Sequence, residues 1–204
     1  MALLEVKGLR RRFGGVSALD GADLAVEKGR ITGLIGPNGA GKTTLFNAVT
    51  GALRPNDGTV TFDGTDVTGW RADRLAGIGL SRTFQVAREL SLLQVGDNRA
   101  IDLSGGQKKL LELGRALMAE PKLIMLDEPA AGINPTLARK LGEHILALKA
   151  RGITFLIIEH NMGLVAALCD HVVVLVQGKP FAEGRFTDLR SDPRVQEAYM
   201  GHRA

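Results

Sequence analysis

The chain has 204 residues, 45% of them hydrophobic and 24% charged, and it carries a formal net charge of +4. This composition is that of an ordinary soluble globular protein, with a single domain as its default organisation. No stretch approaches the roughly 20 apolar residues that span a bilayer, and charges of both signs are interspersed along the chain. These features exclude a transmembrane helix and a concentrated nucleic-acid-binding footprint.

Two features indicate where the protein works. The N-terminal residues, Met1 to Gly8, include Glu5 and contain no cleavable apolar segment, so nothing there marks the chain for export. Cys169 is the only cysteine and lies in an apolar stretch, so it cannot form an internal disulfide and is expected to have a packing role. Both features favour a reducing, cytosolic location.

Short apolar or β-branched runs recur along the chain and predict strands. They lie at residues 3–6, 31–35, 60–62, 123–126, 154–158 and 172–176. Three of the later runs are apolar at nearly every position, which is typical of parallel strands covered by helices on both faces. The sequence therefore predicts an α/β core with a mostly parallel sheet.

Helices are predicted between these strands. One amphipathic helix follows Gly106 and ends before Pro121, and a second runs from about Pro135 to Gly152. The first third differs, because turn signals rich in glycine, asparagine and aspartate punctuate its short strands. We expect an antiparallel β portion there, beside the parallel core.

The first motif that carries chemistry follows the strand predicted at 31–35. Residues 36–44 match the G-x-x-x-x-G-K-[ST] phosphate loop, in which glycines let successive N–H groups point into one concavity. A helix that starts near Lys42 adds its positive end. Lys42 would reach the β- and γ-phosphates, and the Thr43 hydroxyl would bind Mg²⁺. Nucleotide binding is expected at Gly36, Asn38, Gly39, Ala40, Gly41, Lys42, Thr43 and Thr44.

Two carboxylates follow the apolar strand predicted at 123–126. Asp127 and Glu128 therefore lie at the carboxyl edge of the sheet, where open α/β sheets place their ligands. Asp127 is expected to hold the Mg²⁺ shell. Pro129 favours an extended backbone at Glu128, from which the side chain would orient or deprotonate the attacking water. Loop and carboxylates together predict a P-loop nucleotide hydrolase.

A third motif narrows this class. Leu103-Ser104-Gly105-Gly106-Gln107 stands directly before the first predicted helix, and it offers a second donor-rich helix N-terminus suited to an anion. It matches the signature of ATP-binding cassette proteins, which the sequence resembles over nearly its whole length. The resemblance implies that Ser104, Gly105, Gly106 and Gln107 close on the ATP of a partner subunit. Two chains would then sandwich two nucleotides head to tail.

Further residues match this family in order along the chain. Gln85, in Arg82-Thr83-Phe84-Gln85, resembles the Q-loop glutamine that contacts Mg²⁺ and the attacking water. His160 resembles the switch histidine that touches the γ-phosphate. Phe13 stands where the family stacks an aromatic ring on adenine, and a core role for Phe13 stays open. The resemblance implies catalytic roles for Lys42, Gln85, Glu128 and His160, with Mg²⁺ bound by Thr43, Gln85 and Asp127.

Four segments resemble the subunits that energise branched-chain amino acid uptake in prokaryotes. Ala130 to Pro135 corresponds to the D-loop but carries Asn134 where most of the family has Asp, which keeps the hydrogen-bonding shape and loses the charge. Arg82 to Gln85, Ile158 to Met162 and Val195 to Gly201 share the resemblance. It implies an importer ATPase on the cytoplasmic face of the membrane. Its partners would be a second cassette, permease subunits and a solute-binding protein, with no nucleic acid.

One span departs from the family pattern. Only 17 residues, Val86 to Asp102, separate Gln85 from Leu103. The family places there a helical subdomain of several tens of residues that receives the transporter. Either residues are missing from the sequence, which we favour, or the span is truly deleted, and an intact mass near 21.8 kDa would establish the deletion.

The expected organisation is one nucleotide-binding domain over residues 1–204. Residues 1–85 form its phosphate-loop and antiparallel β part, 86–118 a remnant of the helical subdomain, and 119–204 the rest of the α/β core. A soluble cassette ATPase acting on nucleic acid or ribosomes is the alternative function. Such proteins usually carry a long coiled-coil insertion or two cassettes in one chain, and the sequence has neither.

Overall fold

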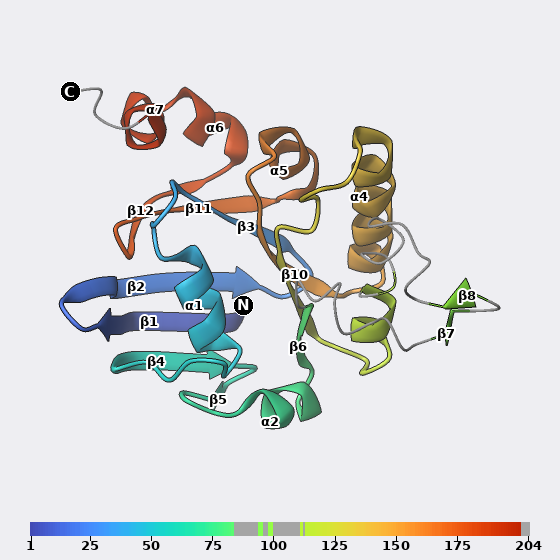
Figure 1. The fold of residues 1–204 in the computed structure, drawn as a ribbon, viewed down its shortest axis with the longest axis horizontal. Coiled ribbons are helices and arrows are strands. Elements are labelled where there is room, and N and C mark those ends of the chain that lie inside the picture. Colours follow the sequence, from blue (N-terminus) through green and yellow to red (C-terminus); the bar gives the residue numbers. More distant parts are fainter. Residues whose placement is uncertain (84–93, 96–97, 100–110, 112, 201–204) are drawn as a thin grey trace.

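The computed structural model describes residues 1–83, 94–95, 98–99, 111 and 113–200. Within them, a six-stranded sheet and a four-stranded sheet dominate the fold (Figure 1). In spatial order, the six-stranded sheet contains β12 (Lys179–Gly184), β11 (His171–Val176), β3 (Ile31–Ile35), β10 (Thr154–Ile158), β9 (Leu123–Asp127) and β6 (Leu80–Thr83). Its pairs are parallel except for β11 with β12. The predicted α/β core is confirmed.

The four-stranded sheet is antiparallel and contains strands from the first third of the chain. Its order is β2 (Val16–Glu27), β1 (Ala2–Phe13), β4 (Asp57–Phe62) and β5 (Thr65–Asp66). β1 and β2 form a hairpin around the turn at 14–15. The predicted antiparallel portion is confirmed, and the run predicted at 3–6 proves to be part of a 12-residue strand. A short hairpin, β7 (Gln94–Val95) with β8 (Asn98–Arg99), lies apart from both sheets.

Helices cover both faces of the six-stranded sheet. They are α1 (Lys42–Val49), α2 (Ala72–Gly77), α4 (Pro135–Ala150), α5 (Met162–Leu168), α6 (Phe186–Ser191) and α7 (Pro193–Met200). Residues 113–117 are also helical, so the helix predicted to end before Pro121 is confirmed over this part. The described part of the chain contains no helix that is long and apolar enough to cross a membrane.

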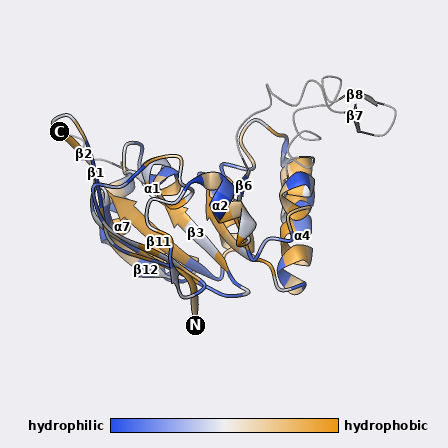
Figure 2. Ribbon diagram, turned by 90° about the horizontal axis from the view of Figure 1, so that it is seen from below, coloured by the Kyte–Doolittle hydropathy of each residue, from blue (hydrophilic) through white to orange (hydrophobic). Residues whose placement is uncertain are grey.

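The central strands are apolar at nearly every position because successive side chains point to opposite faces of the sheet, and both faces are buried. Leu156 and Ile158 of β10 pack into a cluster that contains α1 and the antiparallel sheet, whereas Phe155 and Ile157 pack against α4 and α5. In Figure 2 the central strands are mostly coloured as hydrophobic, whereas α4 carries both hydrophobic and hydrophilic colours. Cys169 packs against the second cluster, and burial raises the pKa of its thiol to about 12. Its predicted packing role is confirmed.

The parallel register brings three strand ends to one edge of the sheet. Ile158 of β10 pairs with Asp127 of β9 on one side and with Leu34 of β3 on the other. The residues that follow β3, β9 and β10 therefore emerge together. These are the phosphate loop, Glu128 and the Glu159-His160 pair.

Candidate functional site

The phosphate loop joins β3 to α1 in the predicted manner. Gly36 has φ 151°, and a Cβ there would lie 2.1 Å from the carbonyl oxygen of Leu175. Gly41, the N-cap residue of α1, has φ 96°, and a Cβ there would lie 2.4 Å from the carbonyl oxygen of Ala18. Because only glycine fits at either position, the loop is held closely between β11 and β2.

Lys42 lies within this loop and faces the two carboxylates. Its side chain is buried, and Nζ donates hydrogen bonds to the carbonyl oxygens of Gly36 at 2.8 Å and Pro37 at 2.9 Å. Burial lowers the pKa of Lys42, and the negative charges of Glu128 and Asp127 oppose this effect. Thr43 is exposed at the start of α1, and Thr44 is half-buried.

Asp127 is held by Arg82, for which the sequence motifs predict no role. Arg82 Nη2 lies 3.0 Å from Asp127 Oδ2, and both side chains are largely buried. Arg82 Nη1 also donates to Asn47 Oδ1 and, at 3.3 Å, to Thr50 Oγ1. Since Asn47 lies on α1 and Thr50 follows it, Arg82 ties the carboxylate to the helix that begins with Lys42.

Glu128 and His160 form a direct pair. Glu128 Oε1 lies 2.9 Å from His160 Nε2, and both side chains are partly exposed. The extended backbone predicted for Glu128 is wrong, because its φ is 48°, in the left-handed region. Its N–H donates to the carbonyl oxygen of Ile158 at 2.9 Å, so contact with β10 overrides the local effect of Pro129.

Phe13 lies at the exposed end of the β1–β2 hairpin. Its exposure is 48%, so the alternative core role is wrong. The guanidinium of Arg11 lies 4.8 Å from its ring centroid. Phe13 pairs with Val16, two residues before the Ala18 carbonyl that backs the phosphate loop. The ring is therefore carried by the same strand pair that supports the loop.

Five predicted site residues lie outside the described residues. They are Gln85, Ser104, Gly105, Gly106 and Gln107. The structure brings together Lys42, Asp127, Glu128 and His160 at one sheet edge. Sequence motifs gave no role to Arg82 or to the buried Glu159. For Glu159 the available signal was a charged residue directly after an apolar buried strand.

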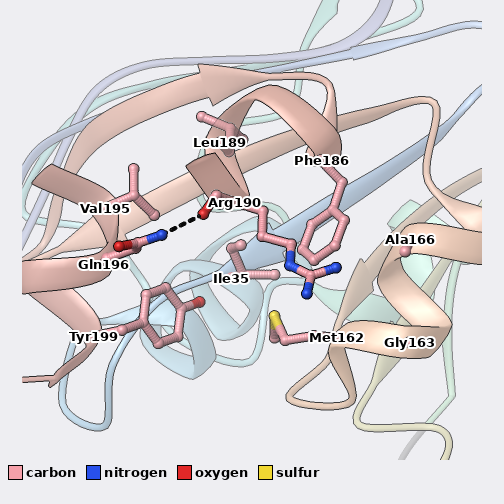
Figure 3. Close-up of a pocket in the computed structure, with 10 residues that line it drawn as sticks. All are labelled: Ile35, Met162, Gly163, Ala166, Phe186, Leu189, Arg190, Val195, Gln196 and Tyr199. Atoms are coloured by element: carbon pink, nitrogen blue, oxygen red, sulfur yellow. Dashed lines mark hydrogen bonds between the residues drawn. The ribbon is translucent and has the colours of Figure 1, made fainter. Parts of the chain in front are cut away.

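The C-terminal helices pack beside the phosphate loop. A cavity of about 560 Å³ lies between α5, α6, α7 and Ile35, the last residue of β3. Figure 3 shows its mainly apolar side chains converging from these elements. Burial raises the pKa of Tyr199 on α7 to about 12, and its hydroxyl lies beside the backbone of Gly36. The C-terminal segment thus reaches the first residue of the loop.

A glycine-rich loop between a parallel strand and a helix, with Lys42 inside it and acidic residues at the same sheet edge, defines a P-loop nucleotide-binding protein. Comparison with protein families gives a match to the ABC transporter model over residues 19–98 and 80–131. The chain belongs to the ATP-binding cassettes of ABC transporters. A second model, for branched-chain amino acid ATP-binding cassette transporters, matches residues 179–204, which include β12, α6 and α7.

Relatives and solved structures match along the full chain. A crystal structure of a nucleotide-free ATP-binding cassette from an ABC transporter has a TM-score of 0.94 and 36% identity, covering 99% of this chain and all of its own. The high-affinity branched-chain amino acid transport ATP-binding protein BraF of Pseudomonas aeruginosa is 35% identical over 98% of each chain. The high-affinity branched-chain amino acid transport ATP-binding protein LivG of Escherichia coli is 33% identical over 98% of each chain.

The comparisons also bear on the short span before the signature. The alignment with the Pseudomonas protein covers 249 positions, 45 more than the 204 residues of this chain. The two matches to the ABC transporter model overlap at residues 80–98, where the short span begins. The truncated helical subdomain expected from the sequence agrees with both observations.

Proposed function

We propose that the chain is the ATP-hydrolysing subunit of an importer for branched-chain amino acids. The observation that carries the hydrolytic part is the Glu128–His160 pair, with 2.9 Å between Oε1 and Nε2. It stands at the sheet edge that also presents Lys42 and Asp127. The solute is proposed from the names of the relatives and from the match of residues 179–204.

Each residue of the candidate site has a proposed task. Lys42 and the N–H groups of residues 36–44 bind the phosphates, with Phe13 on the adenine ring. Glu128 orients the attacking water and accepts its proton, and His160 binds the γ-phosphate and holds Glu128 in place. All these tasks concern charge and orientation, which supply most of the catalysis in phosphoryl transfer.

The residues present fit a magnesium ion. Asp127 offers a carboxylate whose Oδ2 is held by Arg82, and Thr43 offers an exposed hydroxyl at the start of α1. Magnesium is commonly bound by one or two protein oxygens together with substrate phosphates and water. When bound, Mg²⁺ would neutralise charge on the β- and γ-phosphates. Gln85 is proposed as a further ligand and as a contact of the attacking water.

The proposed partners follow from the family. Ser104, Gly105, Gly106 and Gln107 would close on the ATP of a second cassette, so dimerisation becomes ATP-dependent. Permease subunits and a solute-binding protein would complete the importer, with this chain on the cytoplasmic face of the membrane. The alternative, a cassette acting on nucleic acid or ribosomes, receives no support from the relatives.

Replacing Glu128 tests the hydrolytic role. Glu128→Gln should keep ATP binding and lower turnover by at least about 100-fold, because the carboxylate that accepts the proton is lost. The ATP-bound variant should run as a dimer in size-exclusion chromatography. Glu183→Gln is a matched control, since Glu183 also faces a histidine, His171, at 3.5 Å. Hydrolysis by Glu128→Gln at the parent rate would show that the role given to Glu128 is wrong.

A further inference from the structure

Glu159 is a buried carboxylate with three backbone partners. It follows β10 directly, and its exposure is 4%. Oε1 accepts a hydrogen bond from the N–H of Ala130 at 2.8 Å. Oε2 accepts from the N–H groups of His160 at 3.0 Å and Asn161 at 3.1 Å. One side chain therefore joins two segments that are 29 residues apart in the chain.

These two segments carry the paired side chains of the site. Ala130 lies two residues after Glu128, and the N–H of Ala131 bonds the Glu128 carbonyl at 3.0 Å, so residues 128–131 form a tight turn. At its start the turn is tied to β10 by the bond from the Glu128 N–H to Ile158. At Ala130 it is tied to Glu159. The positive φ of Glu128 needs such surroundings, because this conformation persists only where its neighbours fix it.

The chemistry of these contacts requires a carboxylate. All three groups that face Glu159 are N–H donors, and two carboxylate oxygens can accept from all of them in charge-assisted hydrogen bonds. A glutamine at this position has one acceptor oxygen, and its NH₂ group would face an N–H of one segment. At least one of the three N–H donors would then lose its partner, and that segment would move.

We propose that Glu159 is a positioning residue for ATP hydrolysis, which fixes the turn after Glu128 and the backbone of His160 relative to each other. It holds the two side chains at their hydrogen-bonded separation without touching the nucleotide. The proposal rests on the proposed function of Glu128 and His160. If Glu159 only accepted hydrogen bonds from loop N–H groups, it would stabilise the fold. Its loss would then lower overall stability without a selective fall in the turnover rate.

Steady-state kinetics of Glu159→Gln separate these roles. We expect kcat to fall about 10- to 100-fold, as for partners that orient a reacting group, while KM for ATP stays near the parent value because the phosphate loop is untouched. Glu143→Gln, an exposed position on α4, is the control and should match the parent. A parent-like kcat in Glu159→Gln would overturn the proposal. A loss of nucleotide affinity as large as the fall in kcat would also overturn it.

A double-mutant cycle tests whether Glu159 acts through His160. In a His160→Ala background, Glu159→Gln should lower kcat far less than it does in the parent, because the two residues share one task. If kcat of the double variant falls by the product of the two single-variant factors, this expectation is contradicted. If Glu159→Gln does not fold, as judged by binding of a fluorescent ATP analogue, Glu159→Asp replaces it. The shorter carboxylate keeps the charge, loses the reach to one segment, and should show the same selective loss of kcat.

Amide hydrogen exchange gives a readout that does not depend on hydrolysis. In Glu159→Gln, peptides covering residues 128–131 and 159–161 should exchange faster than in the parent, while peptides from α4 should not change. Unchanged exchange in both peptides would overturn the positioning role even if kcat falls. A parent chain that hydrolyses no ATP would instead refute the proposed function, and the exchange result would still decide whether Glu159 holds the two segments.

Discussion

Lys42 lies between two carbonyl oxygens of its own loop and two carboxylates of the neighbouring strand end. Lys42→Ala should lower ATP affinity by about 10- to 100-fold, because a hydrogen bond to a charged group contributes roughly 1.5–3 kcal/mol. Titration with a fluorescent ATP analogue measures this. Lys140→Ala, at an exposed position of α4, is the control. Equal affinity in the two variants would contradict a phosphate-binding role for Lys42.

At the residue scale, the groups that stand in local motifs could be predicted from the sequence. The phosphate loop, Asp127 and Glu128 follow apolar strands, so pattern and position together reveal them. Arg82 was missed because its partner Asp127 is 45 residues away and its charge looks like that of any edge-strand residue. The backbone of Glu128 was mispredicted because a local preference next to proline is weaker than a hydrogen bond to β10.

At the element scale, the strands buried on both faces were predicted closely, while polar edge strands were not. β3 and β10 have the predicted bounds, because every position in them is buried. β6 contains Ser81, Arg82 and Thr83, and β12 contains Pro180, so neither shows an apolar run. Both strands lie at sheet edges, where polar residues and proline are tolerated.

Asn134 is an element-scale feature with a measurable effect. Its side chain accepts from the N–H of Leu137 at 2.9 Å and caps α4, whose first residue is Pro135. Asn134→Ala should lower the free energy of unfolding by about 1 kcal/mol, whereas Asn134→Asp, the residue usual in the family, keeps the cap and should change it by less than about 0.5 kcal/mol. Urea unfolding followed by circular dichroism compares the two. Identical midpoints for the alanine and aspartate variants would exclude a capping role.

At the scale of the whole molecule, the proposed nucleotide chemistry and the proposed coupling to a transporter fall in different parts of the chain. Lys42 begins α1 and Asp127 ends β9, while Glu128 and His160 follow β9 and β10, so all four belong to the described α/β core. The family resemblance implies that the transporter docks at the span between Gln85 and Leu103, and the alignment with the Pseudomonas protein runs over 45 more positions than this chain has. Shortening this span should therefore separate binding from coupling.

Two chains test this separation: the 204-residue chain, and one in which residues 86–102 are replaced by the corresponding segment of the Pseudomonas protein. Both should bind a fluorescent ATP analogue equally, because the phosphate loop and its strands are unchanged. Only the longer chain should show ATPase activity stimulated by the permease subunits, since it alone has the full docking subdomain. Equal stimulation of both chains would show that the short span suffices for coupling. An intact mass near 21.8 kDa for the protein isolated from its own cells would establish that the short span is native.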